Sequence, residues 1–102
     1  MAVMVVLTLE GDPDRIQQAL NSDPERLQAV SDRARGKGAL HHAFYGNVDG
    51  SGVVVVDEWE TAEAFQQFFA ESQEIGQMMG EAGVTNQPVP TFWNKLDTPD
   101  AF

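Results

Sequence analysis

The chain has 102 residues, of which 16 are acidic and 6 are basic, so its formal charge is −10 with neutral histidines. This length supports one folded domain, and a hydrophobic content of 42% is too high for a disordered chain. The acidic balance argues against nucleic acid and anionic membranes as partners. The lack of cysteine excludes disulfides, thiolate metal sites and cysteine nucleophiles. We expect a single domain over residues 1–96, followed by a short tail at 97–102.

The N-terminal apolar stretch bears on where the protein resides. Residues 2–7 are apolar, which is too short a run to cross a membrane. Neither a basic leader region nor a small-residue cleavage site accompanies it. We therefore expect a cytoplasmic protein without a membrane partner.

The first third of the chain predicts a strand followed by a divided helix. Residues 2–10 (AVMVVLTLE) are dense in Val and Leu, which is typical of a strand buried on both faces. Asp12 and Asp23 each precede a proline, and this pair of residue types is a helix start with an N-cap and a proline in the first turn. Two consecutive helices are therefore expected between this strand and the next.

The middle of the chain predicts an antiparallel hairpin. Residues 39–47 (ALHHAFYGN) and 53–59 (VVVVDEW) are strand-like, and the segment NVDGSG between them is a strong turn signal. The four successive valines of the second strand predict burial on both of its faces.

The last third predicts a helix and an edge strand. Thr61 is a plausible N-cap for a helix whose apolar residues recur at spacings of three and four. Gly76 and Gly80 weaken the second half of that helix, so a bend or two pieces are expected there. Prolines precede the final strand at 91–96, which favours an edge position.

The resulting order, β-α-β-β-α-β, predicts an α+β ferredoxin-like fold with one four-stranded antiparallel sheet and its helices on one face. Two helices can cover only one face of such a sheet, yet the first strand and the valine strand are apolar on both sides. The sequence therefore predicts a homodimer in which two sheets pack face to face. The alternative is a monomer whose helices and tail cover both faces.

The segment from Trp59 to Phe65 (WETAEAF) places Trp-Glu at a strand end, then a small capping residue, then a Phe inside the helix. This pattern resembles the antibiotic biosynthesis monooxygenase-like group of dimeric α/β barrels. The resemblance covers nearly the whole chain and implies a homodimeric barrel with a pocket between sheet and helices in each subunit. Members of the group include cofactor-free oxygenases of phenols and quinols, haem degraders, isomerases, and proteins with no assigned activity.

The haem-degrading branch of the group can be compared residue by residue. Its members use an Asn in the first strand, a Trp in the second helix and a His ten residues later. When the chains are aligned on Trp59, those helix positions hold Phe68 and Met78, and the first strand lacks Asn. The resemblance therefore does not extend to haem degradation. Trp59 lies at a strand end and does not correspond to the helical Trp.

The adjacent histidines His41 and His42 are the candidate catalytic residues. Neighbouring strand residues point to opposite faces, so these two cannot chelate one metal within a chain. One of them should face the pocket, where a neutral imidazole could accept a proton from a phenol or quinol. By alternation His42 groups with Leu40 and Phe44, and His41 with Ala39, Ala43 and Tyr45, but the pattern leaves open which set faces the pocket. The alternative is a histidine that only packs in the core or an interface.

Two further sets could line a site for an aromatic ligand, because aromatic rings and flexible thioethers suit an adaptable apolar pocket. The alternative for each set is plain packing in the core or at a dimer seam. The candidate substrate-binding residues are Tyr45, Trp59, Phe65, Phe68, Phe69, Met78, Met79, Trp93 and Asn94. Asp57 and Glu58 precede Trp59, and one of these carboxylates could turn inward. No metal or cofactor is expected, since the usual metal and nucleotide motifs do not occur.

Two main functional hypotheses follow from these residues. The first is a cofactor-independent monooxygenase, or a related isomerase, that acts on a small aromatic or quinone-like molecule. The second is a non-catalytic protein of the same fold that binds a ligand or serves a structural role. A pocket that contains a histidine would favour the enzyme, and an interior filled by its own side chains would favour the structural role.

Overall fold

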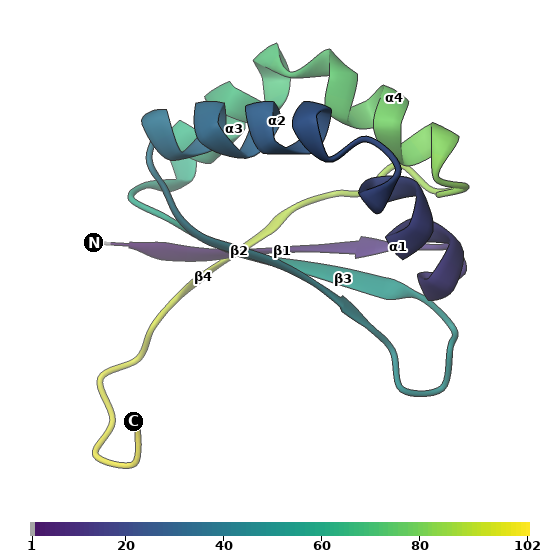
Figure 1. Cartoon of the computed structure of the whole chain (residues 1–102). Helices are drawn as coiled ribbons and strands as arrows, with labels where there is room; N and C mark the ends of the chain where they lie inside the picture. The colour runs from purple at the N-terminus through teal and green to yellow at the C-terminus, as the bar shows by residue number, and fades with distance from the viewer. Residues whose placement is uncertain (1) are drawn as a thin grey trace.

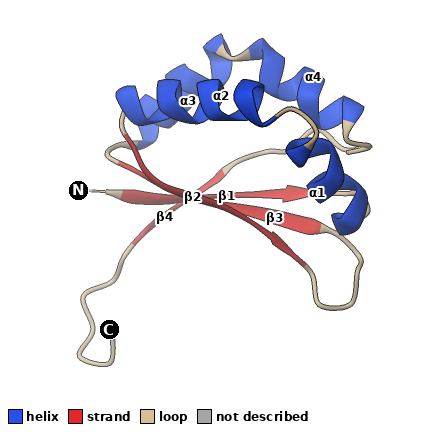
Figure 2. Ribbon diagram, in the orientation of Figure 1, coloured by secondary structure: helices blue, strands red, loops and turns tan. Residues whose placement is uncertain are grey.

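The computed structural model describes residues 2–102 and contains four strands and four helices (Figures 1 and 2). In chain order the elements are β1 (Val3–Leu9), α1 (Pro13–Asn21), α2 (Pro24–Gly36), β2 (Ala39–Gly46), β3 (Val53–Trp59), α3 (Ala62–Glu71), α4 (Gln73–Glu81) and β4 (Thr91–Asn94). The strands form one antiparallel sheet in the order β2-β3-β1-β4. All helices lie on the same face of this sheet (Figure 1). The predicted ferredoxin-like arrangement is confirmed. No helix within residues 2–102 combines the length and apolar character needed to cross a bilayer.

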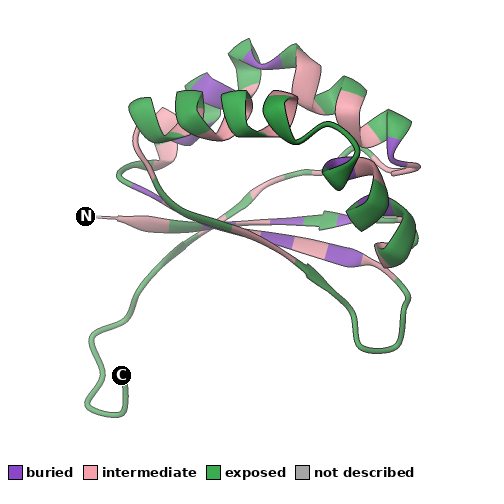
Figure 3. Ribbon diagram, in the orientation of Figure 1, coloured by how far each residue is buried: buried purple, intermediate pink, exposed green. Residues whose placement is uncertain are grey.

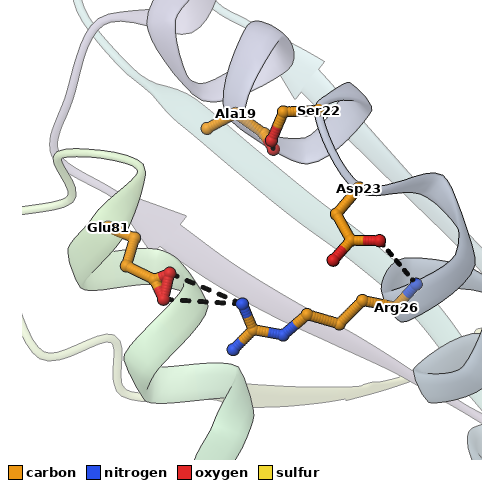
Figure 4. Close-up of polar contacts among 5 residues, drawn as sticks. All are labelled: Ala19, Ser22, Asp23, Arg26 and Glu81. Carbon is orange, nitrogen blue, oxygen red and sulfur yellow. Dashed lines mark hydrogen bonds and ion pairs between the residues drawn. The ribbon is translucent and has the colours of Figure 1, made fainter.

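The first helix is divided, as the two Asp-Pro pairs predict. The Asp12 carboxylate accepts a hydrogen bond from the amide of Asp14, 3.2 Å away, and starts α1. The Asp23 carboxylate accepts from the amide of Arg26, also at 3.2 Å, and starts α2 (Figure 4). Between them the Ser22 hydroxyl donates to the carbonyl of Ala19 at 2.7 Å and ends α1. Each helix end in this region is therefore satisfied by a neighbouring side chain.

The second helix is divided at Ser72, and not at Gly76 or Gly80 as the glycines suggested. Ser72 leaves the helical conformation at φ −110° and ψ 66°, and its hydroxyl accepts a hydrogen bond from Arg33 of α2 at 3.2 Å. Both glycines remain inside α4, in open space where a Cβ atom would meet nothing within 4 Å. The break therefore follows a polar anchor to a neighbouring helix and does not follow helix propensity.

The core lies between the sheet and helices α1 and α3 (Figure 3). Its members are apolar and almost fully shielded from solvent, and they include Val5, Leu9, Ile16, Trp59, Phe65 and Phe68. Helices α2 and α4, by contrast, contribute no fully buried side chain among their described residues. Only partly buried residues, such as Leu27 and Met79, reach the core from them. These two helices therefore cover the sheet without filling the space beneath them.

The sheet face away from the helices is also largely apolar. On β1 and β3 it carries Met4, Val6, Val54 and Val56, because these residues alternate with the buried ones. Met4 is 43% exposed and Trp93, opposite it on β4, is 55% exposed. The predicted apolar character of both faces is therefore present in the structure, and the helices leave this outer face bare (Figure 1).

The loop before β4 is fastened to the end of β1 by Asn86. Its side-chain amide donates to the carbonyl of Thr8 at 2.9 Å, and its side-chain oxygen accepts from the amide of Glu10 at 2.8 Å. The amide of Thr85 donates to the carbonyl of Glu10 at 3.0 Å. Together these contacts continue the edge of the sheet beyond β4, so the loop is held beside the open space under the helices.

Candidate functional site: a cavity containing a histidine and a carboxylate

A cavity of about 1160 Å³ lies between the sheet and helices α2, α3 and α4. Its floor includes Leu7, Val55 and Trp59, and its roof includes residues of α2 and α4. The volume exceeds what one drug-sized molecule occupies, and most of the lining is apolar. An interior filled by its own side chains is therefore not what this structure contains.

The pleat of β2 and β3 turns His42 toward the helices. His42 lies opposite Asp57, and His41 lies opposite Glu58. Asp57 is spaced two residues from the buried Val55 and from the buried Trp59, so it lies on their helix-facing side of β3, and its partner His42 shares that side. His41 and Glu58 consequently belong to the outer face. The alternation pattern alone had left this choice open.

A β-bulge changes one part of the expected grouping in β2. The register shifts between Ala39 and His41, which leaves Leu40 as an extra residue. Ala39 pairs with the buried Trp59 and packs against the core, so it shares a face with His42 and Phe44. Strict alternation placed Ala39 with His41 and placed Leu40 with His42, and this grouping is wrong because the bulge interrupts the alternation.

His42 and Asp57 form a hydrogen-bonded pair. Nδ1 of His42 lies 2.6 Å from Oδ1 of Asp57, and the indole Nε1 of Trp59 donates to Oδ2 of the same carboxylate at 3.0 Å. The Asp57 side chain is 9% exposed, whereas that of His42 is 46% exposed. The ring of His42 also packs against that of Phe44 in a T-shaped arrangement, with the ring centroids 5.1 Å apart. The imidazole is thus anchored on one side and open to the cavity and solvent on the other.

Asp57 is the site residue that the sequence analysis did not include among its candidates. It was noted only as a carboxylate that could turn inward, and the structure shows that it does so while Glu58 turns outward. The signal was present in the strand itself. Trp59 as a core residue places every second residue before it on the same face, and one of these is Asp57.

His41 has a different environment from His42. Its Nε2 lies 3.8 Å from Oε1 of Glu58, and its side chain is 81% exposed on the outer face. The residue borders the cavity but directs its ring away from the helices. Of the two candidate histidines, only His42 is placed with its ring on the cavity side of the sheet.

An aromatic cluster forms the deep wall of the cavity. The Trp59 ring contacts those of Phe65 and Phe68 at centroid distances of 5.4 and 5.3 Å. Phe69 stacks on Phe65 at 5.3 Å. Among the residues proposed from sequence, the cavity therefore brings together Trp59, Phe65, Phe68, Phe69, Met78 and Met79, besides the two histidines.

Three other residues proposed from sequence lie elsewhere. Tyr45 pairs with Val54 and Trp93 pairs with Met4, which places both rings on the outer face of the sheet. Tyr45 is 56% exposed. Asn94 is exposed at the end of β4 and does not line the cavity. No group of three or more His, Asp or Glu side chains within residues 2–102 comes close enough together to hold a metal ion.

Comparison with known proteins identifies the fold. No family model matches the chain, and no curated protein matches it in sequence. Among solved structures, a monooxygenase from the ActVA-Orf6 gene of Streptomyces coelicolor, in complex with the ligand nanaomycin D, is similar with a TM-score of 0.70 and 22% identity, over 95% of this chain and 88% of that chain. A putative antibiotic biosynthesis monooxygenase from Bordetella bronchiseptica is similar with a TM-score of 0.71 and 19% identity, over 93% of this chain and 97% of that chain.

A dimeric ferredoxin-like protein from an uncultured marine organism is also similar, with a TM-score of 0.63 and 13% identity over 96% of this chain and 97% of that chain. At these identities the likeness concerns the fold. The resemblance to antibiotic biosynthesis monooxygenase-like proteins is confirmed at that level, over nearly the whole length of the chain.

Proposed function

We propose that the protein is a homodimeric, cofactor-independent monooxygenase that oxidises a small hydroxylated aromatic or quinone-like molecule. The observation that carries this proposal is the position of His42, a ring that can take up a proton, at the wall of a large and mostly apolar cavity. Two of the solved structures with the same fold are described as a monooxygenase and a putative antibiotic biosynthesis monooxygenase, the first in complex with nanaomycin D, which supports the choice of reaction.

The lining of the cavity favours a flat aromatic ligand. Trp59, Phe65 and Phe68 are almost fully shielded and form a fixed aromatic backing. The partly exposed Phe69 offers ring surface, and Met78 and Met79 on α4 can adjust to the outline of the ligand. The chain carries a formal charge of −10, which repels an anionic ligand and does not oppose the approach of a neutral one. A neutral phenol that becomes an anion only after it is bound meets both conditions.

The proposed reaction needs a base and oxygen only. His42 accepts the phenolic proton through Nε2, and the imidazolium that forms lies against the Asp57 carboxylate. The phenolate is electron-rich enough to react with O₂ in an apolar site. One oxygen atom replaces the hydrogen on the ring carbon opposite the hydroxyl, and the product is a quinone. The other oxygen atom leaves as water, together with that ring hydrogen and the proton that His42 returns. The substrate supplies all four electrons, so no external reductant takes part.

We place a second copy of the chain on the outer face of the sheet. That face presents Met4, Val6, Val54 and Val56, with the large rings of Tyr45 and Trp93 beside them. Apolar surfaces of this kind are usually covered, and a symmetric dimer is the commonest way to cover them. The description of one solved structure of this fold as dimeric supports the same assembly.

Oxygen consumption with a panel of phenols that carry hydrogen on the ring carbon opposite the hydroxyl tests the proposed reaction. The native protein should consume oxygen with at least one member and release a quinone. His42→Gln should lose about 10²-fold or more of that rate, because the general base is removed. His41→Gln is the matched control, since it changes the adjacent histidine on the opposite face, and its rate should equal that of the native protein. Equal rates in all three proteins would overturn the role of His42. Saturable binding with no oxygen consumption would favour the non-catalytic alternative.

A further inference from the structure

We infer that Asp57 is a positioning residue that holds His42 in a single tautomer, with Trp59 in turn fixing Asp57. In this arrangement Nδ1 of His42 carries the hydrogen and Nε2 is left with the lone pair. The tautomer is a property of the ligand-free chain. Only its consequence for the reaction rests on the function proposed above.

The hydrogen-bonding capacities of the three groups lead to this assignment. The indole Nε1 of Trp59 can only donate, and it donates to Oδ2 of Asp57. A carboxylate can only accept, so the 2.6 Å contact between Oδ1 and Nδ1 of His42 requires the hydrogen to be on Nδ1. Neutral imidazole carries one ring hydrogen, and Nε2 is therefore the acceptor that remains for a ligand.

The strands hold these groups in register. His42 and Asp57 are directly opposite each other in the antiparallel pairing of β2 with β3, and Trp59 lies two residues further along the same face. Trp59 is only 1% exposed and is packed between Phe65 and Phe68. An indole that cannot move fixes one oxygen of the carboxylate, and the other oxygen is thereby aimed at the histidine.

The surroundings of the carboxylate agree with such a role. Asp57 is one of two buried polar residues in the described chain, and the other, Ser72, anchors a helix break. A buried carboxylate costs free energy unless both of its oxygens are bonded, and here both are bonded. Neither bond is needed to hold β2 to β3, whose backbone ladder continues on both sides of this pair.

The exchange of Asp57 for Asn gives a sharp test, because Trp59 discriminates between the two ends of the amide. The indole donor needs the amide oxygen, which leaves the amide NH₂ directed at Nδ1 of His42. The NH₂ group can only donate, so the hydrogen on His42 should move from Nδ1 to Nε2. The nearly isosteric substitution Asp57→Asn therefore predicts a switch of tautomer without a change of shape.

The tautomer can be read by ¹⁵N NMR of the full-length, ligand-free protein at neutral pH. His42 in the native protein should show a protonated Nδ1 and an unprotonated Nε2, and Asp57→Asn should reverse this pattern. Glu58→Gln is the matched control, since it alters the neighbouring carboxylate beside His41, and it should leave His42 unchanged. An unprotonated Nδ1 in the native protein would overturn the inference without any variant. The same holds for a tautomer that Asp57→Asn does not alter.

A kinetic measurement separates this inference from the proposed function. With a substrate identified in the oxygen assay, Asp57→Asn should reduce kcat about 10- to 100-fold with little change in KM, because the ligand still binds but meets a protonated nitrogen. A native rate in a variant whose tautomer has switched would show that His42 is not the base. That result would contradict the proposed function and leave the positioning role of Asp57 intact.

Discussion

Arg33 of α2 and Glu74 of α4 form an ion pair across the roof of the cavity, between two helices that bury no side chain completely. The same guanidinium group donates to the hydroxyl of Ser72 and lies 5.4 Å from the ring centroid of Phe68. A second pair, Arg26 with Glu81 at 3.4 Å, joins the same helices seven residues earlier in α2 and seven residues later in α4 (Figure 4). The roof is therefore fastened by polar contacts and not by interlocked apolar side chains.

The Arg33–Glu74 pair predicts a pH-dependent part of the stability. Hydrogen bonds from the backbone amide of Glu74 and from Arg33 lower the pKa of the Glu74 carboxyl from its ordinary value of 4.5. A carboxyl whose pKa is lower in the folded state contributes stability above the unfolded pKa, and this contribution is lost as the pH falls through the folded pKa. Both side chains are partly exposed, so solvent screening keeps the interaction below about 1 kcal/mol.

A double-mutant cycle with Arg33→Gln and Glu74→Gln measures this interaction, because it cancels the other contacts of Arg33. The coupling in the free energy of unfolding, from urea titrations, should be favourable at pH 7 and smaller at an acidic pH at which Glu74 is protonated in the folded protein. Addition of salt at pH 7 should weaken it. A coupling of equal size at both pH values would contradict the ionic origin of the contact.

The outer face of the sheet predicts the effect of a buried charge on assembly. Val56 lies near the middle of that face, paired with Val6 on one side and Ala43 on the other. Val56→Glu should convert the proposed dimer to a monomer at micromolar concentration, because an unpaired carboxylate in a dry interface is costly. Sedimentation velocity provides the measurement. Gln18→Glu adds the same charge to an exposed position on α1 and should remain dimeric.

The turn between α2 and β2 predicts opposite outcomes for two nearby glycines. Gly38 has a φ of 119°, and its carbonyl accepts a hydrogen bond from the amide of Glu60 at 2.9 Å. Gly38→Ala should lower the free energy of unfolding by about 1–2 kcal/mol, since a Cβ atom disfavours this conformation. Gly36→Ala, at the end of α2 with no atom within 4 Å of its added Cβ, should leave it unchanged or raise it slightly. Equal losses in the two variants would contradict the conformational explanation.

The sequence was sufficient for features that depend on local chemistry. Asp12, Asp23 and Thr61 cap helices as predicted, because a side-chain acceptor before a helix satisfies amides that nothing else can reach. The hairpin was predicted with its second strand at the observed bounds, since a glycine-rich turn between two apolar runs permits little else. The four-stranded antiparallel sheet with its helices on one face then followed from the order of the elements.

Features that depend on contacts between residues far apart in the chain could not be predicted from the sequence. The helix break at Ser72 depends on Arg33, 39 residues away in the chain, and the propensities of Gly76 and Gly80 pointed elsewhere. The bulge at Leu40 arises in the pairing of two strands and has no signature in either strand alone. The candidate site was predicted as far as its aromatic wall and its two histidines. The selection of His42, and the recognition of Asp57 as its partner, required the register between β2 and β3.

Asn86, which fastens the loop before β4 to the end of β1, has a consequence for the order of events in folding. Its two hydrogen bonds join positions that are 76 and 78 residues apart, so they can form only after nearly the whole polypeptide has been arranged. Closing so long a loop costs conformational entropy, and two hydrogen bonds alone do not offset that cost early in folding. These two hydrogen bonds should therefore form after the folding transition state. The amide proton of Glu10, which donates one of them, should exchange with deuterated solvent sooner than the amide protons in the middle of β1.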